Sequence, residues 1–297
     1  MTNNQPTLLV TGASGQLGRR VIEILLAAET AATIVATTRT PEKLADFSEQ
    51  GVVVRQADFN QPESLAEAFK GVDRLLLIST DALGEPGLRL KQHRAAIKAA
   101  EAAGVNHVVY TSLVNPGPES AVLFAPDHQG TEDALAESEM GWTVLRNNLY
   151  TDLLLGSLSQ AVQMGQLFSA AEDGQTAYVT REDCAQAAAA ALAADFSGQR
   201  TINITGPEAL SRTELAELAT KLSGTPVSYV PISVAALTEN MVAAGLPEPI
   251  AATYASIDKA IALGQLALVT DDFEELTGQK PTSIEAFLTE HRQALSS

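Results

Sequence analysis

Three glycines near the start of the chain have the spacing of a diphosphate-binding loop. Gly12, Gly15 and Gly18 follow an apolar run at intervals of three residues. In this pattern the first glycine allows a tight turn, the second lets a diphosphate approach the backbone, and the third lets a helix pack on a strand. We expect the amides of Gly15, Gln16 and Leu17 to point outward, where the helix dipole favours an anion. The predicted contacts of this loop with a dinucleotide are Gly12, Ser14, Gly15, Gln16, Leu17 and Gly18.

A positive charge follows the second expected strand. Sheets that bind NAD carry an acidic residue there, which binds the ribose 2′-hydroxyl. The sequence has no acid at this place and has Arg39 instead, whose guanidinium suits a 2′-phosphate. Lys43, one helical turn further on, adds a second cation. The pattern predicts NADP(H) as the cofactor, and the alternative is that Arg39 is a solvated loop residue.

Polar side chains also end the later strands. In such sheets ligands bind at the carboxyl ends of the strands. A carboxylate after the third strand can accept the exocyclic amine of adenine, while an aromatic ring covers the adenine face. Because small polar residues end strands routinely, a purely structural role stays open for these positions. The predicted cofactor contacts here are Asp58, Phe59, Ile78, Ser79, Thr80, Thr111 and Ser112.

A tyrosine–lysine pair, which passes a proton in many reductases of this kind, is absent from the sequence. The residues four positions after the five tyrosines are Val114, Leu154, Glu182, Ser233 and Asp258. In the helix that should carry the pair, Glu132 cannot replace a lysine. His128 in that helix could act as an acid instead, because histidine titrates near neutral pH. We favour the alternative that His128 bonds to a nearby carbonyl at the helix start.

The sixth expected strand is followed by further candidates for the site. Asn147, Asn148 and Tyr150 come at the edge that should face a nicotinamide, so they could orient its carboxamide or line the acceptor pocket. Ordinary polarity after a strand is the alternative, and Arg146 beside them could form a structural ion pair. The candidate catalytic residues are therefore Asn147, Tyr150 and His128.

The order of apolar runs and helical segments predicts the fold. Apolar strands separated by helices of ten or more residues indicate parallel pairing with both faces covered, hence an α/β fold of the Rossmann type with a doubly wound parallel sheet. We expect residues 1–155 to form this domain and 176–205 to return to it. Residues 206–297, with 156–175, are expected to form a smaller, mostly helical α/β domain for the substrate. The six expected strands are residues 7–11, 33–37, 52–56, 74–78, 107–111 and 142–145.

The composition excludes several classes of function. Lys and Arg number 19 and Asp and Glu 36, giving a net charge of −17, which disfavours nucleic acid and anionic membranes. The single cysteine, Cys184, excludes an internal disulfide and suggests a reducing compartment. Four scattered histidines show no metal-ligand spacing, so we predict no metal site. Without a signal peptide or a membrane-length apolar run, the expected location is cytoplasmic.

Several stretches of the chain resemble the NmrA-like atypical short-chain dehydrogenases/reductases, and above all their NAD(P)H:quinone oxidoreductase and triphenylmethane reductase branch. They include LLVTGASGQLGRRVIEILL, VATTRTPEK, VRQADFNQPESL, TVLRNNLYTD and, near the C-terminus, GLPEPIAATYASIDKAIALGQ. The resemblance implies an NADP-binding Rossmann domain, a small C-terminal domain and a substrate pocket in the cleft between them. Members of that branch also lack the tyrosine–lysine pair. The positions that match the cofactor motifs are Gly12, Gly15, Gln16, Leu17, Gly18 and Arg39.

These observations together predict an NADPH-dependent reductase. Without a proton relay, hydride transfer by positioning suits a quinone-like or other conjugated, electron-poor acceptor, whose reduced form needs no assisted protonation. One alternative is a non-catalytic NADP-binding redox sensor that docks on a protein, because the NmrA-like group contains regulators. Another is a carbonyl or imine reductase that uses His128 as acid. The expected partner is a small aromatic molecule, and a homodimer is possible through the helix expected at residues 87–103.

Overall fold

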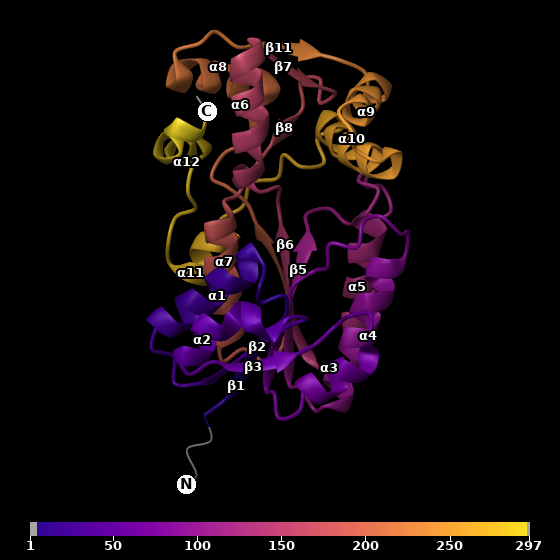
Figure 1. The fold of residues 1–297 in the computed structure, drawn as a ribbon, viewed down its shortest axis with the longest axis vertical. Helices are drawn as coiled ribbons and strands as arrows, with labels where there is room; N and C mark the ends of the chain where they lie inside the picture. The colour runs from indigo at the N-terminus through magenta and orange to yellow at the C-terminus, as the bar shows by residue number, and fades with distance from the viewer. Residues whose placement is uncertain (1–4, 296–297) are drawn as a thin grey trace. The chain divides into compact units, whose positions relative to one another are not determined.

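The computed structural model describes residues 5–295, which divide into two compact units (Figure 1). The first unit comprises residues up to 112, together with 127–146 and 184–202. The second unit comprises residues 113–126, 147–183 and those from 203 onward. Within residues 5–295, no helix has both the length and the apolar character needed to cross a membrane.

The first unit is built around a seven-stranded sheet with the order β3-β2-β1-β4-β5-β6-β9. The pairs β1–β2, β2–β3, β1–β4 and β4–β5 are parallel. The strand order reverses between β1 and β4, which is where ligands bind in doubly wound sheets. This topology confirms the predicted Rossmann-type sheet. The strands are β1 (Thr7–Val10), β2 (Thr33–Thr38), β3 (Val53–Gln56), β4 (Arg74–Leu77), β5 (His107–Leu113), β6 (Gly141–Asn147) and β9 (Gln199–Ile204).

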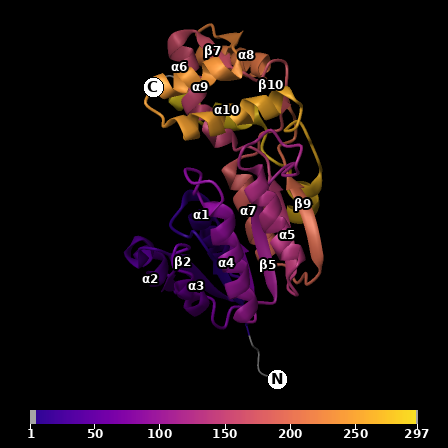
Figure 2. The ribbon, with the colours of Figure 1, turned by 90° about the vertical axis from the view of Figure 1, so that its right-hand side faces the viewer.

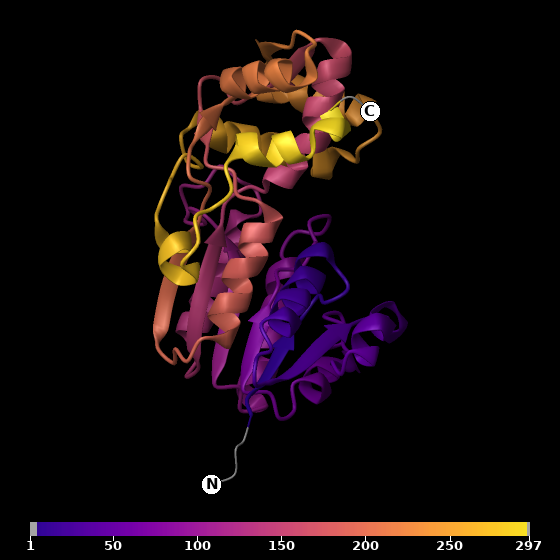
Figure 3. The same ribbon diagram turned by 90° about the vertical axis from the view of Figure 1, so that its left-hand side faces the viewer.

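Helices cover both faces of this sheet. The views of Figures 1, 2 and 3 place α3, α4 and α5 on one face and α1, α2 and α7 on the other. This two-sided cover explains why the strands are apolar throughout rather than alternating. The helices are α1 (Gln16–Ala27), α2 (Ala45–Glu49), α3 (Pro62–Ala68), α4 (Leu88–Ala102), α5 (Ala125–Ala136) and α7 (Arg181–Ala193), with a 3₁₀ turn, η1, at Pro41–Leu44.

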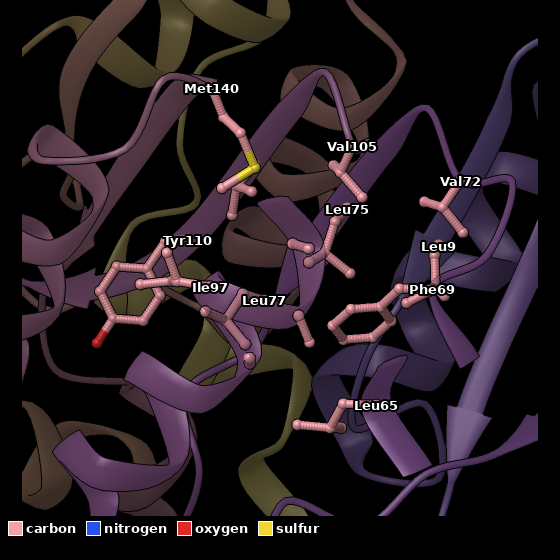
Figure 4. Packing of buried hydrophobic residues seen from close by; sticks show 14 of the residues in the cluster. Leu9, Leu65, Phe69, Val72, Leu75, Leu77, Ile97, Val105, Tyr110 and Met140 are labelled. Atoms are coloured by element: carbon pink, nitrogen blue, oxygen red, sulfur yellow. The ribbon is translucent and has the colours of Figure 1, made fainter. Parts of the chain in front are cut away.

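The core between the sheet and α3, α4 and α5 fixes the strand ends. Leu65 and Phe69, at and just after α3, are fully buried in one cluster with Leu9, Leu75 and Leu77 from β1 and β4 (Figure 4). Burying a leucine or phenylalanine side chain stabilises the fold by about 1.5–3 kcal/mol. The carboxyl ends of β1 and β4 are thereby held in place beside each other.

The second unit is mostly helical and has two small sheets. β7 pairs with β11 in parallel, and β8 pairs with β10 in antiparallel fashion. Ser211 caps α8, and its exchange of hydrogen bonds with Glu214 forms a capping box. That this unit binds the substrate stays a prediction. Its elements are η2 (Thr151–Leu153), α6 (Leu154–Met164), β7 (Gln166–Ser169), β8 (Gln175–Thr176), β10 (Leu210–Ser211), α8 (Arg212–Ser223), β11 (Ser228–Pro231), α9 (Val234–Ala243), α10 (Glu248–Ala262), α11 (Asp272–Thr277), α12 (Ile284–Glu290) and η3 (Arg292–Leu295).

Candidate cofactor site

The glycine loop joins β1 to α1 by a turn that only glycines fit. Gly12 has a φ of +59°, a left-handed conformation that side chains with a Cβ disfavour. A Cβ added at Gly18 would lie 2.5 Å from the carbonyl oxygen of Gly12, so the helix packs on the loop only without one. The spacing of three thus has the steric cause expected from the sequence.

The N-terminus of α1 presents free amides at this loop. Gly15 is the N-cap and offers no side-chain cap, and the first turn contains no acidic residue. The first-turn amides of Gln16 and Leu17 have no intrahelical acceptor, so they can bind an anion. The expectation that the amide of Gly15 points outward is wrong, because this N–H donates to the carbonyl of Gly12 at 2.9 Å and closes the turn.

A cavity of about 290 Å³ lies over the carboxyl ends of β1 to β4, entirely within the first unit. Its walls combine the glycine loop with the residues that follow each of these strands. The Cβ-free surface of Gly12 and Gly15 fits a diphosphate there, whereas Gln16, Leu17 and Gly18 are not among the lining residues. The predicted residues that line the cavity are Gly12, Ser14, Gly15, Arg39, Asp58, Phe59, Ile78, Ser79 and Thr80.

Arg39 is an exposed cation at the rim of this cavity. Its guanidinium has no ion pair or hydrogen bond within residues 5–295, and only its carbonyl is engaged, by Gln56. A free guanidinium at the end of β2 can receive a phosphate through two parallel hydrogen bonds. Lys43 is also exposed, on η1, but the structure does not bring it into the cavity lining.

Asp58 and Phe59 follow β3 as expected. One carboxylate oxygen of Asp58 accepts the N–H of Asn60 at 2.9 Å, which leaves the other oxygen available for a ligand. The Phe59 ring is partly buried and packs against the core cluster beneath the sheet edge. The pair can therefore offer an acceptor and an apolar surface to an adenine ring.

The residues after β4 are held by a chain of hydrogen bonds. The N–H of Ser79 donates to Oγ1 of Thr111 at 2.9 Å, and the N–H of Thr80 donates to Nε2 of His93 at 3.0 Å. The Thr80 hydroxyl donates to Gln92 at 2.7 Å, and Gln92 lines the cavity. Thr111 therefore positions Ser79, and it does not line the cavity itself.

Ser112 is engaged with a buried ion pair rather than with the cavity. Its hydroxyl donates to Glu132 at 2.6 Å, and Arg146 bonds the same carboxylate at 2.6 and 3.1 Å. Glu132 is 9% exposed, so the charge of Arg146 compensates a carboxylate that burial would otherwise penalise. The predicted structural role of Arg146 is therefore found, and Ser112 is not among the residues that line the cavity, so its contact with the cofactor stays a prediction.

His128 is too deeply buried to serve as the proton donor that one alternative required. It is 3% exposed, and its Nδ1 lies 2.8 Å from the hydroxyl of Tyr110. Burial, and then the charge of Arg89, hold the pKa of His128 well below its usual value, so the ring is neutral. His128 is therefore a buried residue that packs against Tyr110 of β5, and it is not exposed as a proton donor would need to be.

The residues after β6 differ sharply in how they are bonded. Both polar atoms of the Asn148 side chain have a partner, since its amide N–H donates to the carbonyl of Leu266 at 3.0 Å and its oxygen accepts the N–H of Leu149. Tyr150 lies under the guanidinium of Arg181, at 5.3 Å from the ring centre. Asn147 is 4% exposed, and neither polar atom of its side chain has a partner in the part of the chain that the structure describes. Of these candidates, Asn147 has free bonding capacity.

Some residues that line the cofactor cavity were not predicted from the sequence. Asn60 and Gln92 bond each other at 2.9 Å and line the cavity with Thr37 and Thr38. The sequence does contain an indication of a role for Gln92. Gln92 and His93 lie one helical turn before Ala96 and Ile97, on the buried face of α4. Polar residues on such a face need specific partners. Their partners could not be read from one sequence.

Known proteins share this architecture. A family described as NAD(P)H-binding matches residues 12–195. The chain belongs to this NAD(P)H-binding family. It is 37% identical to quinone oxidoreductase 2 of Escherichia coli over 93% of this chain and 96% of that protein.

Solved structures of two similar reductases show the same fold. The NADPH complex of the E. coli quinone oxidoreductase has a TM-score of 0.89 at 37% identity, covering 95% of this chain and 98% of that one. The NADP(H) complex of triphenylmethane reductase from Citrobacter sp. has a TM-score of 0.87 at 37% identity, covering 97% and 99%. These likenesses confirm the resemblance read from the sequence, the fold and the prediction of an NAD(P)H-dependent oxidoreductase.

Proposed function

We propose that this member of the NAD(P)H-binding family is an NADPH-dependent reductase of quinone-like or other conjugated, electron-poor acceptors. The observation that carries the choice of cofactor is Arg39, a guanidinium without a partner in the described chain, beside a cavity that the glycine loop closes. Gln16 and Leu17 would hold the diphosphate through their amides, and Asp58 and Phe59 would hold the adenine. The names and bound cofactors of the two similar reductases support this assignment.

The chain contributes positioning rather than a proton relay to the reaction. NADPH supplies the hydride when bound, and holding the reactants in contact contributes about 7–11 kcal/mol of barrier lowering. Asn147 is our candidate for orienting the carboxamide, because its buried amide has a donor and an acceptor to offer. Thr80 and Ser79, held by His93 and Thr111, would bind the ribose next to the nicotinamide. No tyrosine–lysine pair is needed when the reduced acceptor is a stabilised anion.

The test is the oxidation of NADPH by the purified protein with a panel of quinones, followed at 340 nm. We expect turnover with 1,4-naphthoquinones and little or none with a simple unactivated ketone such as cyclohexanone. A protein that binds NADP⁺ tightly but oxidises NADPH with no member of the panel would refute the reductase assignment and favour the sensor alternative. A preference for the unactivated ketone would contradict catalysis without a proton donor.

A further inference from the structure

The second unit contains a cavity of its own. Its volume is about 400 Å³, within the range of small-molecule sites, and all of its lining residues belong to this unit. Apolar side chains provide most of the wall, and leucines, among them Leu154, Leu158 and Leu237, are the commonest of them. A mostly apolar cavity with few polar groups is typical of a site for a small organic ligand.

The polar part of this wall is a buried ion pair. Arg212 bonds Asp258 at 3.1 Å, and their side chains are 11% and 13% exposed. The other oxygen of Asp258 accepts from the Ser169 hydroxyl at 2.6 Å and from the N–H of Ala170 at 2.8 Å. Burial disfavours the charged guanidinium, but Tyr178 and Asp258 outweigh this and raise the pKa of Arg212 above its usual value. The positive charge of Arg212 is thus paired with the carboxylate of Asp258, and the ion pair has no net charge.

Hydrogen-bond donors are left over in this cluster. Arg212 has five N–H groups, and three of its bonds are to Ser169, Tyr178 and Asp258. Two N–H groups thus lack an acceptor within residues 5–295. The Tyr178 hydroxyl, on a side chain that is 3% exposed, accepts from Arg212, and its own proton has no acceptor there either. Buried donors without acceptors are costly, so an oxygen-bearing ligand would relieve them.

We propose that the cavity of the second unit binds an uncharged, apolar conjugated compound whose carbonyl oxygen accepts hydrogen bonds from Arg212 and Tyr178. The leucine wall selects the apolar ring system, and the surplus of donors selects an acceptor oxygen. Because Asp258 already balances the charge of Arg212, a carboxylate would add an uncompensated charge in a buried site. A neutral carbonyl is therefore favoured over an anion. The binding of such a compound does not depend on the proposed function. The further statement that this compound is the hydride acceptor does rest on the proposed function.

The test measures binding to the nucleotide-free protein, where no turnover takes place. The probes are 2-methyl-1,4-naphthoquinone and 2-methylnaphthalene, which has the same ring system without carbonyl oxygens, and both are followed by ligand-detected NMR. We expect the quinone to bind at least tenfold more tightly than the hydrocarbon. Tyr178→Phe should weaken quinone binding by about 3- to 10-fold, the value of one hydrogen bond, and should leave hydrocarbon binding unchanged. Tyr229→Phe is the matched control, because Tyr229 is outside the cavity lining.

A second variant blocks the cavity without touching the core. Ser157 is an exposed lining residue on α6, so Ser157→Trp should abolish quinone binding, while Gln163→Trp, on the same helix outside the lining, should not. Equal quinone affinity in wild type, Ser157→Trp and Tyr178→Phe would overturn the proposal, whether or not the enzyme turns over. Lost binding in Ser157→Trp alongside a wild type that fails to oxidise NADPH would uphold the cavity and refute the reductase. If the quinone KM of Ser157→Trp rises in step with its loss of quinone binding, the ligand of this cavity is the hydride acceptor. If the KM of this variant is unchanged, the cavity binds a separate ligand.

Discussion

The backbone N–H of Thr80 donates to Nε2 of His93 at 3.0 Å. A backbone N–H can only donate, so the neutral ring carries its proton on Nδ1, which lies 2.9 Å from the hydroxyl oxygen of Thr131. Burial, and then the charge of Arg89, lowers the pKa of His93 to about 3. The ring is therefore neutral at physiological pH and holds the end of β4 at the cofactor cavity as a fixed acceptor.

Lowering the pH from 7 to 5 should destabilise the folded protein. In the unfolded chain His93 has its usual pKa of 6.5, but in the folded protein it binds a proton only near pH 3. The unfolded state therefore takes up more protons in this window, and the free energy of unfolding falls as the pH falls. His93 alone accounts for a loss of about 2 kcal/mol. Urea denaturation at the two pH values measures the effect.

The same experiment on two variants assigns the effect to the buried ring. His93→Gln removes the group, so its free energy of unfolding should depend less on pH than that of the wild type, although it starts lower. His291→Gln, at the partly exposed end of α12, is the control and should keep the wild-type dependence. An undiminished pH dependence in His93→Gln would contradict the assignment.

Removing the guanidinium of Arg39 should change which cofactor is used. Arg39→Ala loses charge-assisted hydrogen bonds to the 2′-phosphate, each worth about 1.5–3 kcal/mol, so the KM for NADPH should rise by about 10- to 150-fold. The KM for NADH should stay within about threefold. Steady-state kinetics with both cofactors measures the change, and Arg20→Ala, an exposed arginine paired with Glu23 on α1, is the control. Equal use of NADPH and NADH by the wild type would refute the role of Arg39.

The sheet and the glycine loop could be predicted because their causes are local. The apolar strands and the steric requirement for glycine at positions 12 and 18 depend on residues that are close together in the sequence. The ends of the strands were harder, because they depend on which residues meet across the sheet. Thr111 and Ser112 were expected at the cofactor, but they bond Ser79 and Glu132, which are 32 and 20 residues away.

Histidine chemistry could not be assigned from the sequence. His128 has the ordinary potential to donate a proton, and only its burial beside Tyr110 and Arg89 removes it. The buried pair of Arg212 and Asp258 also had no local signal, because the two residues are 46 positions apart. Charges that pair over such distances become visible only when the chain is folded.

Gly18→Ala should damage both the fold and cofactor binding. The added Cβ would lie 2.5 Å from the Gly12 oxygen and 2.9 Å from the Ala13 Cα, so backbone must move to accommodate it. We expect a loss of about 1–3 kcal/mol in the free energy of unfolding, the usual cost of overpacking, with a larger Kd for NADP⁺. Gly156→Ala on α6 is the control, because its Cβ meets nothing within 4 Å. Denaturation and nucleotide titration of Gly18→Ala that match the wild type would contradict this account of the loop.

Asn147→Leu should separate ligand binding from stability. The substitution keeps the branching of the side chain and removes two buried polar atoms that have no partner in the described chain. The ligand-free protein should therefore unfold at equal or higher urea concentration, because an unsatisfied buried group costs about 1–3 kcal/mol. If the amide serves the nicotinamide or the acceptor, kcat/KM should fall by about tenfold or more at the same time. Asn148→Leu should behave in the opposite way in the denaturation, since its amide bonds Leu266 and Leu149. Lower stability of Asn147→Leu with unchanged kinetics would make the residue a part of the fold and not of the site.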